Sequence, residues 1–153
     1  MQLTLHTDFS LRVLIYLANK REMLSTISEI ADFYQISRNH LVKVVHHLAN
    51  AGFIQTTRGK NGGMKLARDP QLIAIGDVVR RMEPNFDIVE CFNADNPPCV
   101  VASACALKSA LYQANSAFLA VLDRHSLADA MQDGPNLDQL FPLEQLTGRT
   151  TPQ

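Results

Sequence analysis

The sequence predicts a mainly α-helical fold with one small β-hairpin: a winged helix-turn-helix followed by a long helix. Two amphipathic helical patterns meet at a short bend, and a basic hairpin pattern follows them directly. A long apolar stripe at helical spacing occurs later in the chain and predicts the long helix. A chain of 153 residues can form one domain with an appendage, or two small lobes.

The N-terminal segment predicts a short extended piece and then a helix from about Thr7. Its apolar side should pack beneath the next two helices and comprises Leu11, Leu14, Ile15, Leu17 and Ala18. Asp8 and Arg12 are spaced to share one helix face, so they can form a surface ion pair. Asp8 also lies in the first turn, where a negative charge suits the helix dipole.

The two following patterns predict a helix-turn-helix. In TISEIADFYQ, Thr26 is a good N-cap and Glu29 completes a capping box. In SRNHLVKVVHHLANAG, Ser37 is the expected N-cap of a recognition helix and Gly52 its C-terminal stop. One face of this second helix is apolar. The other face carries the side chains expected to reach phosphates and base edges in a major groove, which are Ser37, Arg38, Asn39, His40 and Lys43.

A β-hairpin is predicted next, with FIQTT and MKLA as its strands and an Asn-Gly-Gly turn that tolerates positive φ. Its tip carries Arg58, Lys60 and Asn61, which we expect to contact DNA as a wing. The alternative is an ordinary helical hairpin with a solvated charged loop. Residues 33–68 contain six basic residues and no acidic one, whereas residues 69–153 contain five basic and eleven acidic residues. Such a localised basic face is typical of a DNA-binding protein.

After the break at Asp69-Pro70, the segment IAIGDVVRRMEP predicts an extended turn and a short helix. Arg80 and Arg81 are expected to be solvated on that helix. The first unit, a winged helix-turn-helix DNA-binding domain, therefore spans residues 1–83.

Residues 84–105 lose helical periodicity and contain all three cysteines, Cys91, Cys99 and Cys105. Three thiols in one loop suggest convergent metal ligation, and Cys105 would lie at a helix N-terminus that favours its thiolate. Zinc would need a fourth ligand, usually cysteine or histidine, and the loop contains no histidine. An iron–sulfur cluster also needs about four ligands. A redox switch by thiol pairing, or buried thiols acting as small hydrophobes, remains open on these residues alone.

The segment ACALKSALYQANSAFLAVLDRH predicts the long helix, and SLADAM predicts another turn or two after a Ser126 cap. The apolar stripe comprises Leu107, Ala110, Leu111, Ala114, Ala117, Phe118, Val121 and Leu122. Its small residues allow close helix approach, so we expect a homodimer with paired long helices, which suits two-fold DNA sites. The alternative is that the helix folds back on its own domain. Residues 106–131 then form the dimerisation unit, and residues 132–153 a tail that is weakly patterned.

Several classes of protein are disfavoured. No apolar run is long enough to cross a bilayer, and no secretion signal is visible, so a cytoplasmic protein is expected. There is no nucleophile–base constellation, phosphate loop or acid–base carboxylate cluster, so the chain is not expected to be an enzyme.

Taken in order, these segments resemble a family of winged-helix repressors that carry an iron–sulfur cluster. The resemblance runs from Met1 to about Met131, and RNHLVKV followed by RGKNGG resembles the nitric-oxide-sensing branch in particular. It implies a homodimer that binds an inverted-repeat operator in double-stranded DNA. Nitric oxide would nitrosylate the iron, alter the dimer and release the DNA.

The resemblance also implies a ligand set for a cluster of the four-iron or two-iron type. Cys91, Cys99 and Cys105 match the cluster cysteines, Asp8 matches a fourth ligand supplied by the other subunit, and Arg12 matches its neighbour. A related branch carries a histidine ligand shortly after the third cysteine, where this chain has Lys108. The seven residues between Cys91 and Cys99 make a longer gap than is usual in the family.

Two other functions are compatible with the residues. A cluster in this loop could report iron supply or oxidant instead of nitric oxide. A winged-helix protein-interaction module with a zinc-stabilised loop would bind one zinc per chain, lack colour and show no specific DNA affinity.

Overall fold

The computed structural model describes residues 2–20, 23–97 and 99–132. The predictions for the tail after Gln132 lie outside these residues. The main elements, in chain order, are α1 (Leu5–Lys20), α2 (Ile27–Tyr34), α3 (Arg38–Asn50), β1 (Ile54–Thr57), β2 (Gly63–Leu66), α4 (Ile75–Met82), α5 (Ala106–Asp123) and α6 (Leu127–Gln132). Single 3-10 turns occur at Pro70–Leu72, Glu90–Phe92 and Ala102–Ala104.

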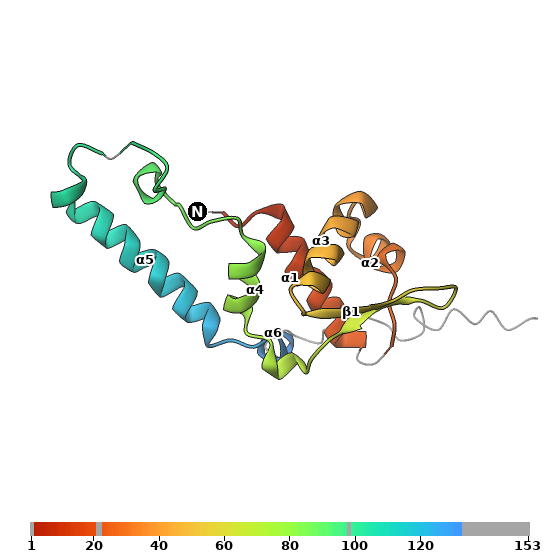
Figure 1. Ribbon diagram of the computed structural model, residues 1–153. Helices are drawn as coiled ribbons and strands as arrows, with labels where there is room; N and C mark the ends of the chain where they lie inside the picture. Colours follow the sequence, from red (N-terminus) through yellow and green to blue (C-terminus); the bar gives the residue numbers. More distant parts are fainter. Residues whose placement is uncertain (1, 21–22, 98, 133–153) are drawn as a thin grey trace, which may run out of the picture.

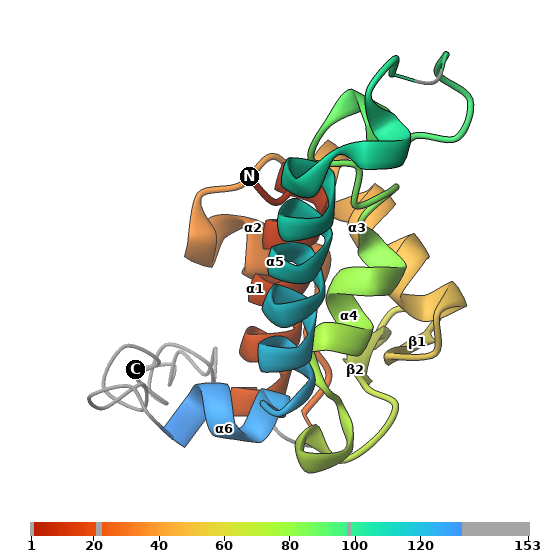
Figure 2. The ribbon, with the colours of Figure 1, turned by 90° about the vertical axis from the view of Figure 1, so that its left-hand side faces the viewer.

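The helices surround α1, which contacts α3, α4, α6 and the hairpin. Figure 1 shows α1 to α3 and the hairpin on one side, α4 in the middle and α5 on the far side. In Figure 2, α5 runs along the front of the molecule beside α4, and the segment that contains the cysteines projects beyond its N-terminal end. The architecture is the mainly helical fold with one small hairpin that the sequence predicts.

The hydrophobic core lies between α1, the helix-turn-helix, the hairpin and α4. Side chains with almost no exposure come from each of these elements and from the segments beside them: Leu14, Tyr16, Leu17, Ile30, Leu41, Leu48, Phe53, Met64, Ile73 and Val78. Leu127 of α6 joins them, whereas α5 contributes no buried residue. The core is therefore formed without the long helix α5, which packs on the outer side of α4.

Local hydrogen bonds define both ends of the helix-turn-helix. The capping box at α2 is confirmed: Glu29 N–H donates to Thr26 Oγ1 (3.2 Å), and Thr26 N–H donates to the Glu29 carboxylate (2.5 Å). Gly52 ends α3 as predicted, with φ of +75°. The amides of Gly52 and Phe53 donate to the carbonyls of Ala49 and Leu48, both at 3.0 Å. This is a Schellman motif, in which glycine avoids the strain of a left-handed backbone.

The hairpin pairs Ile54 with Leu66 and Thr57 with Gly63 in antiparallel register. The backbones of Ser25 and Met64 exchange hydrogen bonds of 2.9 and 2.8 Å, so the link before α2 extends the sheet.

Three local expectations need correction. Positive φ in the hairpin turn occurs at Gly59 (+113°) and not within the Asn-Gly-Gly segment. Gly62 is needed for space, since a Cβ there would lie 2.3 Å from the Thr57 carbonyl oxygen. Ser37 occupies the N-cap position of α3, but its side chain makes no capping hydrogen bond. α1 begins at Leu5, because Thr4 O accepts a hydrogen bond from Asp8 N–H (3.0 Å) and starts the helix earlier.

Candidate functional site

One face of α3 is buried and the opposite face is open. Leu41, Val44, Val45 and Leu48 recur at helical spacing and enter the core. The side chains expected to contact DNA are all exposed, and they are Ser37, Arg38, Asn39, His40 and Lys43. Val42 is also 52% exposed, so this face includes an apolar group that can contact a thymine methyl.

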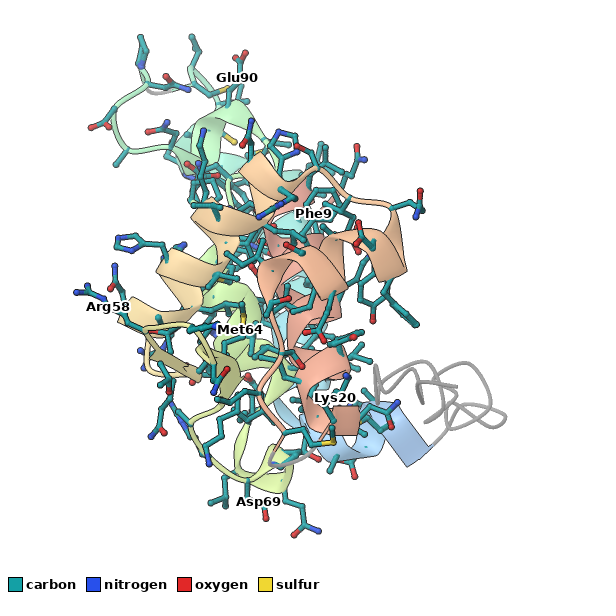
Figure 3. The ribbon with its side chains drawn as sticks, turned by 90° about the vertical axis from the view of Figure 1, so that its right-hand side faces the viewer. Phe9, Lys20, Arg58, Met64, Asp69 and Glu90 are labelled. Atoms are coloured by element: carbon teal, nitrogen blue, oxygen red, sulfur yellow. The ribbon has the colours of Figure 1, made fainter. Side chains whose placement is uncertain are left out.

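The hairpin tip adds a second exposed basic group. Arg58, Lys60 and Asn61 are exposed, and Figure 3 shows Arg58 at the edge of the molecule beside α3. The residues predicted for the recognition helix and for the wing therefore lie on neighbouring elements. The arrangement can present cations to two stretches of a DNA backbone while the helix N-terminus faces base edges.

A histidine pair joins α1 to α3, and sequence reasoning missed it. His6 Nε2 lies 3.0 Å from His47 Nδ1, and the two rings lie 5.2 Å apart. Burial and the neighbouring His47 lower the pKa of His6, and Glu83 partly opposes this shift. No local pattern marks this pair, because its members are 41 residues apart and meet only when α1 packs on α3.

The predicted pair of Asp8 and Arg12 is present on the outer face of α1. Arg12 Nη2 lies 2.8 Å from Asp8 Oδ2, and both side chains are partly exposed. The Arg12 guanidinium also lies 6.0 Å from the ring centres of Phe9 and Tyr34. Asp8 is thus oriented by its neighbour and remains accessible to another molecule.

The three cysteines are placed at one end of the molecule, in the loop between α4 and α5. Cys91 and Cys99 line the same hollow, together with Val89, Glu90, Asn96 and Val100. Cys105 is the N-cap of α5, where its Sγ accepts a hydrogen bond from Lys108 N–H (3.3 Å). The predicted helix N-terminal position of Cys105 is therefore correct.

Within one chain this loop does not gather a complete ligand set. In the described part of the chain, no three Cys, His, Asp or Glu side chains lie close enough together to hold a metal ion. The donors nevertheless fit an iron–sulfur cluster in chemistry, since cysteine thiolates are its usual ligands. Cys99 is exposed, and Cys91 and Cys105 are partly so.

The N-terminal end of the cysteine loop is attached to the rest of the fold. Thr4 N–H and Oγ1–H donate to Glu83 Oε1 at 2.8 and 3.1 Å, which ties the start of α1 to the residue after α4. Asn115 of α5 donates from Nδ2 to the Phe86 carbonyl at 3.0 Å. These contacts connect the loop to α1 and α5, and no sequence motif predicted them.

The long helix α5 divides its apolar stripe between two sides. Leu111, Phe118 and Leu122 are half-buried on the side that contacts α4. The remaining members are exposed and follow alternating three- and four-residue spacing, and they are Leu107, Ala110, Ala114, Ala117 and Val121. Such spacing is typical of a helix that pairs with another helix.

Comparison with known proteins identifies relatives over nearly the whole chain. A family model described as "Rrf2: Iron-dependent Transcriptional regulator" matches residues 3–133. The HTH-type transcriptional regulator NsrR of Bacillus subtilis is 46% identical over 95% of this chain and 100% of its own. The regulator of the same name from Shouchella clausii is 45% identical over 92% of this chain and 95% of its own. These relatives are transcriptional regulators and not enzymes, as the sequence predicts for this chain.

Solved structures give the same fold. CymR (YrzC) of B. subtilis, described as its global cysteine regulator, superposes with a TM-score of 0.72 at 27% identity, over 88% of this chain and 99% of its own. T. potens IscR superposes with a TM-score of 0.68 at 25% identity, over 87% of this chain and 88% of its own.

Among the described residues, no helix is both long and apolar enough to cross a bilayer.

Proposed function

The chain belongs to the Rrf2 family of transcriptional regulators, and from that premise we propose that it is an iron–sulfur-dependent repressor released by nitric oxide. It binds an inverted-repeat operator as a homodimer. The observation that carries the proposal is the joint presence of an exposed basic helix-turn-helix with its wing and a loop that contains every cysteine. The organisation into residues 1–83, 84–105, 106–131 and a tail is part of the same proposal.

DNA contact is proposed through the exposed side of α3 and the hairpin tip. Arg38 and Lys43 reach phosphates or guanine edges, and Asn39 is suited to an adenine edge. Lys60 and Arg58 neutralise backbone phosphates, which gives affinity without sequence information. The net positive charge of residues 33–68 and the net negative charge of residues 69–153 orient the chain so that this side meets DNA.

A homodimer is supported by the unpaired side of α5. Leu107 is 66% exposed and Val121 43% exposed, and three alanines lie between them on the same side. A second copy of α5 would remove this apolar strip from water, and small residues would let the two helices approach closely. Two recognition helices related by a two-fold axis then match an inverted repeat whose half-site centres lie ~10 bp apart.

The cluster ligands proposed are Cys91, Cys99 and Cys105 with Asp8 of the partner subunit. In this chain Asp8 is exposed enough to reach another subunit, and Arg12 holds its carboxylate in place. When bound, the cluster supplies iron that nitric oxide can attack. Compared with a thiolate, the Asp8 carboxylate would be a harder and weaker ligand, so it would be the donor most readily displaced, which would free α1 from the opposite subunit.

The Thr4–Glu83 and His6–His47 contacts carry such a change from the loop to α3. Glu83 directly precedes the cysteine loop, and it holds the start of α1. His6 on the same turn contacts His47 of α3. A displacement at the loop therefore reaches the recognition helix through two hydrogen-bonded contacts.

DNA binding is tested with Lys60→Ala, measured by fluorescence anisotropy on an operator duplex over a range of salt concentrations. We expect weaker binding to every sequence and a salt slope smaller by about one, because one phosphate contact is lost. Arg124→Ala, which removes an exposed positive charge at the end of α5, is the matched control and should leave both unchanged. Unchanged affinity and slope for Lys60→Ala would show that the wing assignment is wrong.

The cofactor is tested by the absorption spectrum of anaerobically purified protein with iron and sulfide assays. A brown protein with matching iron and sulfide, which loses operator affinity on titration with nitric oxide, supports the proposal. Release by oxygen or iron chelation but not by nitric oxide would instead indicate a sensor of oxidant or iron supply. A colourless protein with one zinc per chain and no DNA affinity would indicate the interaction module.

A further inference from the structure

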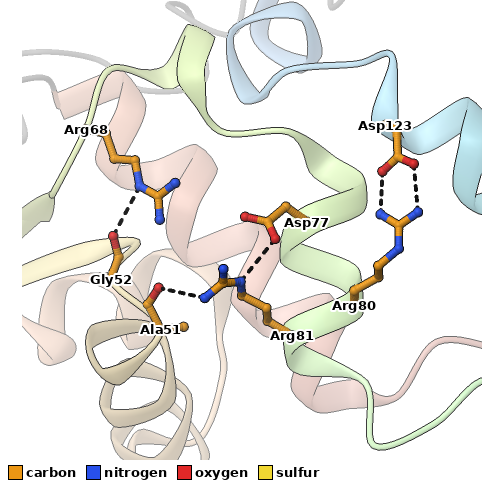
Figure 4. A network of polar contacts seen from close by, with 7 residues as sticks. All are labelled: Ala51, Gly52, Arg68, Asp77, Arg80, Arg81 and Asp123. Atoms are coloured by element: carbon orange, nitrogen blue, oxygen red, sulfur yellow. Dashed lines mark hydrogen bonds and ion pairs between the residues drawn. The ribbon is translucent and has the colours of Figure 1, made fainter.

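An arginine of α4 holds the C-terminal end of α5. Arg80 donates from both terminal nitrogens to the two carboxylate oxygens of Asp123, with Nη2 to Oδ2 at 2.7 Å (Figure 4). These hydrogen bonds lower the pKa of Asp123 below its usual value. The side chains are both 42% exposed, so the pair adds little to stability, but its two-point geometry restricts the angle between the helices.

Gly76 makes this close approach possible. A Cβ at Gly76 would lie 2.0 Å from Asp123 Oδ1 and 3.0 Å from its backbone nitrogen. The same end of α5 is also joined to the start of α4 by backbone, since Ile75 N–H donates to His125 O at 2.9 Å. The contact between α4 and α5 is therefore specific at this end and not a general apolar surface.

The neighbouring arginine of α4 holds the C-terminal end of the recognition helix. Arg81 donates from Nε to Asp77 Oδ1 at 3.0 Å and from Nη1 to the Ala51 carbonyl at 3.4 Å. Its guanidinium lies 5.7 Å from the ring centre of buried Phe53. Arg68 contacts the same ring at 5.1 Å and donates to the Gly52 carbonyl at 3.3 Å. A cation at these carbonyls also complements the dipole of α3.

We propose that Arg80 and Arg81 are positioning residues for DNA recognition, which set the angle between the dimerisation helix α5 and the recognition helix α3. Two adjacent residues of one short helix contact the two functional helices, one on each side (Figure 4). The inference rests on the proposed function, because the angle matters only if α5 pairs and α3 reads DNA.

The angle determines which half-site spacing the dimer accepts. If two copies of α5 pair, each α3 is positioned relative to the two-fold axis through α4. One base pair of added spacing rotates a half-site by about 34–36°, since a turn contains 10–10.5 bp. A loosened connection would therefore tolerate a wrong spacing that the intact protein rejects.

The first experiment measures spacing discrimination by the full-length dimer. The probe is a duplex selected from a random library by the unsubstituted protein, together with versions lengthened or shortened by one base pair. Arg80→Gln and Asp123→Asn change the net charge in opposite directions but break the same contact. We expect both to reduce discrimination between spacings by about 1.5-fold to fivefold, the range of a lost exposed ion pair. Arg124→Gln, next to Asp123, controls for charge and should leave discrimination unchanged.

The inference would be overturned if the variants changed DNA affinity only through their net charge. In that case Arg80→Gln would weaken binding, and Asp123→Asn would strengthen it, by the same factor at every spacing. Unchanged discrimination in both variants would also overturn it, provided that circular dichroism shows both to be folded.

The Arg81 contact is tested without DNA by hydrogen exchange. We expect Arg81→Gln to accelerate hydrogen exchange of the Gly52 and Phe53 amides severalfold, because the end of α3 loses the contact of Arg81 with the Ala51 carbonyl. Arg80→Gln should leave the exchange of these amides unchanged. Equal exchange in Arg81→Gln and the parent would refute the role of Arg81. Failure of the parent protein to select any duplex would refute the proposed function, whereas the exchange result would still decide the Arg81 contact.

Discussion

Replacing Gly76 with alanine should destabilise the protein, although alanine normally favours a helix. Gly76 lies inside α4, where alanine is preferred by ~1 kcal/mol. Here its Cβ would lie 2.0 Å from Asp123 Oδ1 and 2.9 Å from Asp123 Cγ. Overpacking costs about 1–3 kcal/mol, and the displaced Arg80–Asp123 pair about 0.2–1 kcal/mol. We expect a net loss of about 1–2 kcal/mol in the free energy of unfolding, measured by urea denaturation with circular dichroism.

A double-mutant cycle identifies the cause of that loss. Asp123→Ala removes both side-chain atoms with which the new Cβ would collide and leaves the backbone nitrogen of that residue at 3.0 Å, so Gly76→Ala in this background should cost at least ~1 kcal/mol less than in the parent. The coupling between the two positions should then be about 1 kcal/mol or more. The reasoning is wrong if Gly76→Ala costs the same with and without the Asp123 side chain, or if it stabilises the parent protein.

Three further outcomes are expected. Thr26→Ala should lower the free energy of unfolding by ~1 kcal/mol through loss of the α2 capping box, read from urea denaturation; an unchanged midpoint would count against it. Burial and His47 lower the pKa of His6, so its contribution to the free energy of unfolding should be complete above pH 6.5 and be lost as the pH falls through the lowered pKa. His6→Gln should flatten this pH dependence, measured as melting temperatures at several pH values. Ala114→Arg should convert a dimer into monomers in sedimentation, whereas Gln113→Arg on another side of α5 should not.

The local elements and the exposed side of α3 could be predicted from sequence because their causes are local. The capping box at Thr26 and the glycine end of α3 at Gly52 involve neighbouring residues. The apolar spacing of α3 determines which side is buried, so Arg38 and Lys43 could be assigned to the open side in advance. The placement of Cys105 at the start of α5 followed from the loss and return of periodicity.

Contacts between distant parts of the chain could not be predicted, and one local turn was assigned wrongly. Arg80 and Arg81 are exposed, as expected, but their partners could not be predicted, because packing brings Asp123 and the Ala51 carbonyl to them. The turn conformation was assigned to the wrong glycine, because close backbone approach at Gly62 and left-handed backbone at Gly59 both favour glycine in sequence.

By itself, the sequence determined the order and type of the elements, the basic side of the helix-turn-helix and the concentration of cysteines in one loop. These properties follow from residue chemistry and from periodicity within a few turns. Only the tertiary structure decided how α5 divides its apolar stripe, how His6 meets His47, and how α4 connects α5 to α3. Those contacts join residues that are up to 43 positions apart, and they exist only because the shared core brings their helices together.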